Sequence, residues 1–205
     1  YRHDIAGAPP PEDFLGALSE SGAACPLRVA LSVDLGCFTV DPAIEANLRA
    51  VAARLEARGV MVEEVALAFP AEASAAWDRE WDVWQAFMYG DAVPGGEHLL
   101  TRDVRGLIER GRDVRAVSYR QGEHVRTRMA QALQPVLERC DALLCPTLAR
   151  DVPPAAGLYA SAAPVDGKLN DTTMTGVFNL LARLPVLSMP SGFAPSGLPT
   201  GVQIV

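Results

Sequence analysis

The sequence predicts an α/β fold in which a mixed, mainly parallel sheet is flanked by helices. Three patterns indicate it: a strand–helix–strand unit over residues 27–67, helical periodicity over much of residues 71–139, and a short buried strand at residues 141–147 followed by β-rich runs. Such alternation is typical of parallel sheets with helices on their faces. With 205 residues, 49% of them hydrophobic, the chain can fill one core or most of a larger one.

The first unit joins two predicted strands, Leu27–Val33 and Val60–Val65, through a helix. Asp41 is placed to cap this helix, and Pro42 to occupy its first position, where a missing N–H is harmless. Gly59 supplies the left-handed residue that ends it. A unit of this length favours parallel pairing of its strands. Apolar residues at helical spacing mark the buried face of the helix: Ile44, Leu48, Val51 and Leu55.

A second helix is predicted over residues 71–88 and holds all three tryptophans. With one methionine they form a single stripe, consisting of Trp77, Trp81, Trp84 and Met88. The stripe fits two roles: packing in the core or between helices, or forming the wall or lid of an apolar ligand pocket. The Pro-Gly-Gly sequence at residues 94–96 ends the helix, and polar helical segments follow to about Asp113.

A longer helix is predicted over residues 116–139, with a kink at Pro135. Its buried face consists of Val125, Met129, Leu133, Val136 and Leu137. Residues 141–147 then form a short buried strand broken by proline. Residues 150–171 are rich in Pro, Ala and Gly without any period, which is typical of functional or disordered loops.

Composition argues against several classes of function. A formal net charge of -7 disfavours nucleic-acid binding, because that affinity comes mainly from basic clusters. No apolar run reaches the length of a membrane span. The histidines are scattered and no HExxH motif occurs, so we expect no metal site. The cysteines match neither metal-ligand nor disulfide spacing, which predicts buried free thiols and a reducing, cytoplasmic location. They are Cys25, Cys37, Cys140 and Cys145.

No complete catalytic machinery is present in these residues. There is no G-x-S-x-G elbow and no phosphate-binding glycine loop, and Ser191, within Pro190–Phe193, is predicted to be a turn residue. The single lysine, Lys168, lies in a solvated turn of sequence Asp-Gly-Lys-Leu-Asn. A lysine that activates a serine must be buried enough to be neutral, so we do not expect Lys168 to be a catalytic base.

Four motifs in the second half occur in a family-specific order. They are Leu143–Thr147 (LLCPT), Phe178–Leu181 (FNLL), Leu184–Phe193 (LPVLSMPSGF) and Gly197–Val205 (GLPTGVQIV). This order resembles the C-terminal half of the amidase signature enzymes, and Ile5–Gly7 resembles the segment just past their glycine- and serine-rich signature. We therefore expect residues 1–205 to be a partial C-terminal portion of a single amidase domain, without a second domain. The expected fold is an incomplete part of the amidase signature fold, cut at both ends.

The resemblance implies a hydrolase of carbon–nitrogen amide bonds that works through a serine acyl-enzyme and needs no cofactor. The family's Ser–Ser–Lys triad lies in its N-terminal half. The resemblance therefore implies that the catalytic residues are outside these 205 residues, which supply substrate pocket and scaffold. The implied partners are a small-molecule amide and the missing N-terminal half, with no nucleic acid and no membrane. A homodimer is left open.

Candidates for the substrate pocket come from the tryptophan helix and from the segment around the FNLL motif. They are Trp81, Trp84, Met88, Met174, Thr175 and Phe178, and each also fits plain core packing. Asn179 lies six residues before Pro185, where the family usually has five, so we carry no polar role over to it. Arg183 replaces a common glycine, and we expect a surface charge there rather than a contact to a substrate carboxylate.

Two functions of other classes also fit the sequence. One is a non-catalytic α/β module that holds a small molecule in its apolar cleft. The other is an interaction subunit of a two-chain amidase or amidotransferase, in which a separate chain carries the triad. The identity of the amide stays open in every case.

Overall fold

The computed structural model describes residue 16 and residues 27–90, 96–152, 165–182 and 184–205. Its strands are β1 (Arg28–Leu31), β2 (Met61–Glu64), β3 (Ala142–Pro146), β4 (Leu187–Phe193) and β5 (Pro199–Ile204). Its helices are α2 (Pro42–Glu56), α3 (Ala73–Tyr89), α4 (Arg102–Asp113), α5 (Ala116–Leu137) and α6 (Gly176–Leu181), with a 3-10 turn η1 (Glu97–Leu99). The helices predicted over residues 71–88 and 116–139 are thus α3 and α5.

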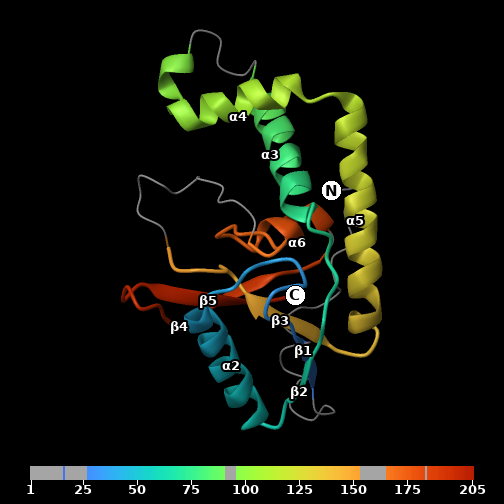
Figure 1. The fold of residues 1–205 in the computed structure, drawn as a ribbon, viewed down its shortest axis with the longest axis vertical. Coiled ribbons are helices and arrows are strands. Elements are labelled where there is room, and N and C mark those ends of the chain that lie inside the picture. The colour runs from blue at the N-terminus through green and yellow to red at the C-terminus, as the bar shows by residue number, and fades with distance from the viewer. Residues whose placement is uncertain (1–15, 17–26, 91–95, 153–164, 183) are drawn as a thin grey trace.

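The strands form one sheet in the order β2-β1-β3-β5-β4 (Figure 1). β1 pairs in parallel with both β2 and β3, whereas β5 pairs antiparallel with both β3 and β4. The predicted α/β class with a mixed sheet is confirmed, and the β1–α2–β2 unit has the expected parallel pairing. A tight turn joins β4 to β5, and in it the Ala194 N–H donates to the Leu198 carbonyl.

Helices cover both faces of the sheet (Figure 1). Successive residues of a strand point to opposite faces. Val29 and Leu31 of β1 therefore pack in one cluster with Leu48 of α2. Ala30, between them, lies in a second and larger cluster, which includes Met129 of α5 and residues of α6. β1 and β3 are consequently buried on both sides, as short apolar strands in α/β proteins usually are, whereas β2 at the edge of the sheet is mostly exposed.

The start of α2 differs in one detail from the prediction. Pro42 occupies the first helical turn and Asp41 precedes it in extended conformation, but the Asp41 side chain makes no capping hydrogen bond. Its Oδ2 instead accepts a hydrogen bond from the Asp151 N–H at 3.3 Å. The predicted side-chain cap is wrong because the loop after β3 supplies a competing donor. Gly59 has the predicted left-handed conformation, with φ +86°.

The predicted turn at Ser191 is also wrong, because Ser191 lies inside β4. The register of β4 on β5 shifts between Pro190 and Gly192, which makes this a β-bulge. β4 is an edge strand, where a proline without an N–H is tolerated. Ser191 is buried, and its hydroxyl lies 2.8 Å from that of Thr200.

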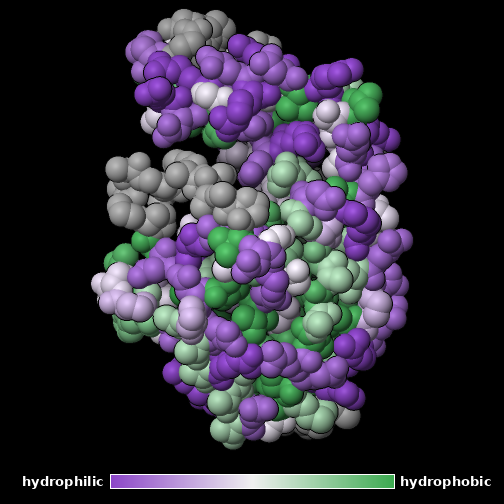
Figure 2. All heavy atoms as spheres, viewed as in Figure 1, coloured by the Kyte–Doolittle hydropathy of each residue, from purple (hydrophilic) through white to green (hydrophobic). Residues whose placement is uncertain are grey.

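The helical pair α3–α4 extends away from the sheet (Figure 1). Ala73 and Ala76, at the start of α3, belong to the larger core cluster, and α3 also packs on α4, α5 and α6. Gly111 of α4 permits this approach, since an added Cβ would lie 2.0 Å from the Asp82 carbonyl oxygen. In Figure 2 the α4 end is mainly hydrophilic, and hydrophobic residues gather nearer the sheet. Within the described ranges, no helix has the length and apolar character of a membrane span.

Candidate functional site

The loop that follows β1, residues 32–38, has an unusual backbone. Leu35 is completely buried yet has φ +52°, and Gly36 follows with φ +79°. An added Cβ on Gly36 would lie 1.9 Å from the Leu67 carbonyl oxygen, so only glycine fits. Holding a non-glycine residue in this conformation costs about 1–2 kcal/mol. Such conformations concentrate at functional sites, and ligands of open α/β sheets bind beyond the carboxyl ends of the strands.

The turn that holds the single lysine packs on this loop. Val165 and Lys168 pair across a two-residue turn, and Leu169 pairs with Phe38. The Lys168 Nζ donates to the Asp34 Oδ2 at 2.5 Å, while the Lys168 side chain stays 45% exposed. The sequence-predicted solvated turn is therefore present, and an ion pair fastens it to the carboxyl end of β1.

Residues 147–151 continue from β3 at the same end of the sheet. Leu148 pairs with Thr173 in an antiparallel bridge, which the Ala149 N–H reinforces by donating to the Thr172 carbonyl. On the other side, the Asp41 N–H donates to the Ala149 carbonyl at 2.8 Å. This double pairing fixes the backbone at Arg150. The Arg150 Nε is buried and has no hydrogen-bond partner.

Gln203 of β5 connects the sheet to the segment before α6. Its side chain is completely buried, and its Nε2 donates to the Pro146 carbonyl at 2.9 Å and to the Met174 carbonyl at 3.3 Å. A buried amide with satisfied donors holds two backbone segments in register. The sequence contained Gln203 only as a letter of the GLPTGVQIV motif. The sequence predicts no role for Gln203 or Arg150, because the partners and the burial of these side chains are set only by the fold.

The tryptophan stripe on α3 lies partly at the surface. Trp77 packs against Gly176 of α6, where an added Cβ would lie 2.3 Å from the indole ring. Further along, Trp81 and Trp84 stack with ring centroids 5.2 Å apart and an interplanar angle of 11°. These two rings are 37% and 40% exposed, and Met88 is 41% exposed. Trp81, Trp84 and Met88 therefore form an aromatic surface rather than part of the core.

The other three pocket candidates lie at α6. Met174 and Phe178 are buried in the larger core cluster, and the Phe178 ring meets that of Phe69 edge to face at 6.1 Å. Thr175 precedes the helix and is partly buried. The six candidates thus divide into an exposed group on α3 and a mostly buried group at α6. Their role in substrate binding stays a prediction.

Two residues considered for polar roles follow in the chain. Asn179 of α6 is exposed, and its side chain makes no hydrogen bond to the described residues. Arg183 lies outside the described residues. Asn179 therefore adds no side chain to the site.

A carboxyl group on α3 has a shifted pKa. Desolvation, followed by repulsion from Asp171 and Asp82, raises the pKa of Asp78 to about 6. Arg110 lowers it only in part, because both of its hydrogen bonds, at 2.9 Å, go to the Asp82 carboxylate. Asp78 therefore titrates closer to neutrality than an ordinary aspartate.

The cysteines within the described ranges are the predicted buried free thiols Cys37, Cys140 and Cys145, whereas Cys25 lies outside those ranges. Burial, followed by repulsion from Asp34, raises the pKa of Cys37 to about 12. A thiol with such a pKa is a poor nucleophile or metal ligand at neutral pH. No cluster of potential metal ligands occurs among the residues that the structure places.

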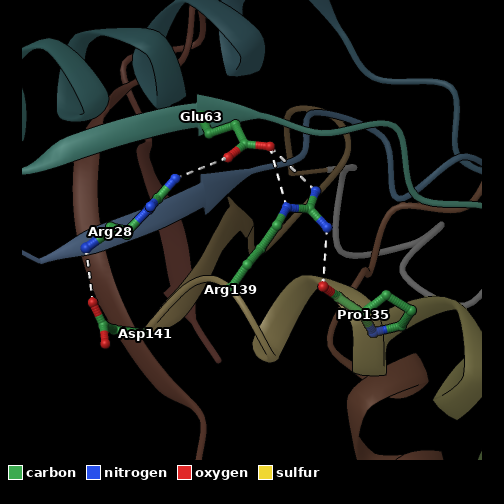
Figure 3. A network of polar contacts seen from close by, with 5 residues as sticks. All are labelled: Arg28, Glu63, Pro135, Arg139 and Asp141. Carbon is green, nitrogen blue, oxygen red and sulfur yellow. Dashed lines mark hydrogen bonds and ion pairs between the residues drawn. The ribbon is translucent and has the colours of Figure 1, made fainter.

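The amino ends of the same strands carry a closed polar network (Figure 3). The Glu63 carboxylate of β2 accepts a hydrogen bond from the Arg139 Nε at 3.3 Å. It also forms ion pairs with Arg139 and, at 3.9 Å, with Arg28 of β1. Arg139 also donates to the Pro135 carbonyl at the end of α5. The Arg28 N–H donates to the Asp141 carboxylate at 2.8 Å. Every member has a partner, so this network joins β1, β2 and α5 without offering a free group to a ligand.

Comparisons with known proteins identify the family. The family model described as Amidase matches residues 6–205. One subunit of the glutamyl-tRNA(Gln) amidotransferase of Psychrobacter sp. (strain PRwf-1) is 27% identical over 221 residues, which cover 94% of this chain and 43% of that protein. An amidase of Pseudomonas putida is 29% identical over 163 residues, covering 78% of this chain and 34% of that protein.

Solved structures share the fold. A bacterial aryl acylamidase of the amidase signature enzymes gives a TM-score of 0.72 at 22% identity, covering 92% of this chain and 41% of that one. The 6-aminohexanoate cyclic dimer hydrolase gives a TM-score of 0.63 at 24% identity, covering 90% of this chain and 42% of that one. The chain therefore spans about two fifths of the length of these relatives. Because the family model matches almost every residue, the chain belongs to the amidase family, whose members are the amidase signature enzymes.

Proposed function

We propose that these residues form the scaffold and part of the substrate pocket of an amidase. The enzyme hydrolyses a carbon–nitrogen amide bond through a serine acyl-enzyme, and its Ser–Ser–Lys triad lies outside residues 1–205. Family membership over residues 6–205 supports the reaction class. A serine hydroxyl needs a base to take its proton and backbone donors to hold the developing oxyanion.

The position of the single lysine is the observation that carries the proposal. Lys168 is bonded to Asp34, and its side chain is 45% exposed in a two-residue turn. A lysine base must instead meet a serine hydroxyl inside a site that excludes water. The chain has no second lysine, so a Ser–Ser–Lys triad requires a lysine from elsewhere.

Exposed apolar surface supports a role as part of a larger fold. β4 is an edge strand with large exposed side chains: Leu187 is 57%, Met189 43% and Phe193 71% exposed. Proteins usually cover or charge such edges. We expect the rest of the amidase domain to cover β4 and to face the aromatic surface of α3, which would then form one wall of the pocket with Thr175 near its floor. The wall residues are Trp81, Trp84 and Met88, backed by Met174 and Phe178.

A comparison of two proteins tests the proposal: the 205-residue chain and the full-length protein that contains it. Only the full-length protein should hydrolyse benzamide, because loss of the nucleophile alone costs on the order of a millionfold in turnover. A fluorophosphonate label followed by peptide mass spectrometry locates the reactive serine, which we expect outside residues 1–205. Enzymatic turnover by the shorter chain, or a label on Ser191, contradicts the proposal.

A second arrangement is favoured by the name of one relative, which is one subunit of an amidotransferase. In that case a separate chain accompanies this one in the active assembly. Co-purification followed by intact mass distinguishes the two arrangements. One polypeptide of more than twice 21.8 kDa supports a single amidase chain, and a stoichiometric partner supports the assembly.

A further inference from the structure

We propose that Arg150 binds a carboxylate group on the amide substrate. The inference rests on the proposed function, because it assigns a substrate class to the same end of the sheet. It concerns one side chain that the sequence did not single out, in the segment that extends β3 beyond its carboxyl end.

The backbone around Arg150 is held firmly before any ligand arrives. Ala149, on one side, is hydrogen-bonded through its N–H to Thr172 and through its carbonyl to Asp41. On the other side, the Asp151 N–H donates to the Asp41 carboxylate at 3.3 Å. A side chain on such a fixed backbone loses little further freedom when it binds a ligand.

The guanidinium group of Arg150 lacks an acceptor. Its Nε is buried without a hydrogen bond, and no ion pair joins Arg150 to the described residues. The adjacent carboxylate does not supply one: Asp151 accepts from the Ser196 hydroxyl at 2.8 Å and from the Val152 N–H at 2.8 Å. A buried N–H donor without an acceptor is costly and rare, so the unpaired Nε indicates an acceptor that a ligand would supply, although the Arg150 residue as a whole is only partly buried.

Other cations near this region are already neutralised. Lys168 is paired with Asp34, and Arg110 with Asp82. Arg150, by contrast, has no ion-pair partner among the described residues, and it lies beside the segment that leads into Thr175 and α6. Arg150 and this segment are neighbours through the Leu148–Thr173 bridge.

The chemistry of the ligand follows from the shape of the donor. A guanidinium presents a planar fork of N–H groups that matches a carboxylate in two parallel hydrogen bonds. A lysine in the same place provides charge without the fork. We therefore expect an amide substrate that carries a free carboxylate, such as the monoamide of a dicarboxylic acid.

Kinetics on a matched pair of substrates test the proposal in the full-length protein. Succinamate carries a carboxylate, and butyramide is its neutral counterpart of similar length. Arg150→Gln should lower kcat/KM for succinamate about 100-fold, the effect of losing charge-assisted hydrogen bonds, and leave butyramide within about twofold. Arg150→Lys should recover part of the loss. Arg58→Gln, at an exposed residue after α2, is the control and should change neither substrate.

A binding measurement separates failure of this inference from failure of the proposed function. The ¹H–¹⁵N resonance of the Arg150 Nε, identified by its loss in Arg150→Lys, should shift saturably with benzoate and not with the neutral benzamide. If no amide is hydrolysed but benzoate shifts this resonance, the carboxylate site stands without the proposed reaction. If amides are hydrolysed, equal losses on both substrates or a resonance that ignores benzoate overturns the site.

Discussion

The two ends of the parallel strands β1 and β3 are built differently. At the amino ends, Arg28, Glu63 and Arg139 form a network in which every member has a partner (Figure 3). At the carboxyl ends, Leu35 has a left-handed backbone and the Arg150 Nε has no acceptor. The amino end holds elements together, whereas the carboxyl end retains groups that folding alone does not satisfy.

The number of bonds does not measure the energetic importance of either end. The side chains of the amino-end network are about half exposed, so water competes for their charges. At the carboxyl end a few buried contacts decide whether the loop can form at all. We therefore expect the loss of stability on substitution to depend on how buried the replaced contact is, more than on the number of bonds it makes.

The largest effect is expected at the carboxyl end, for Gly36→Ala. The new Cβ would lie 1.9 Å from the Leu67 carbonyl oxygen, at a residue whose φ is +79°. We expect a loss of about 3 kcal/mol or more in the free energy of unfolding, measured by urea denaturation. Gly59→Ala is the matched control, because its φ is +86° but nothing lies within 4 Å, and about 1 kcal/mol is expected. Equal losses would remove steric contact as the cause.

A smaller effect is expected for Arg110→Met, between α3 and α4. This change leaves the Asp82 carboxylate, whose side chain is 11% exposed, without its ion-pair partner. The expected loss of stability is about 2 kcal/mol, since a buried acceptor remains unsatisfied. The double variant with Asp82→Asn should recover part of that loss. If the double variant recovers no stability in denaturant titrations, the unpaired charge of Asp82 is not the cause of the loss.

Asp78→Asn should have a pH-dependent effect. Because the folded-state pKa is raised to about 6, the folded protein binds the proton more tightly than the unfolded chain. Stability contributed by this group is therefore complete below about pH 4 and is lost as pH rises through 6. At pH 7.5 the variant should be more stable than the parent, by less than about 1 kcal/mol because Asp78 is exposed to solvent. At pH 4 the two proteins should be equally stable. A gain that does not change with pH would contradict this assignment.

The smallest effect is expected at the amino end, for Arg139→Ala. The Arg139 and Glu63 side chains are 44% and 45% exposed, so the loss should be roughly 0.5 kcal/mol and should shrink in 1 M salt. Thermal melts at two salt concentrations measure it. A loss above about 2 kcal/mol that does not change with salt would contradict the expectation that substitutions at the amino end cost less stability than those at the carboxyl end.

Local patterns in the sequence predicted most of the elements correctly. The helix spacing over residues 42–56 and the glycine at residue 59 appear in the structure where they were expected. The prediction for Ser191 was wrong, because Pro-Ser-Gly suits a bulge on an edge strand as well as a turn. Trp81 and Trp84 were ambiguous for another reason. Periodicity shows that they share a face but not whether anything covers it.

The sequence by itself determined the α/β class, the family and the placement of a lone lysine in a polar turn. These depend on short-range pattern and on motifs that are continuous in the chain. The tertiary structure alone decided which cation is paired. Lys168 and Arg150 are both basic residues outside the predicted helices. Folding brings Asp34, 134 residues away in sequence, to Lys168, while it leaves the Arg150 Nε buried without an acceptor. The order of strands in the sheet decides which residues so distant in sequence become partners, and strand order cannot be predicted from composition and motif spacing.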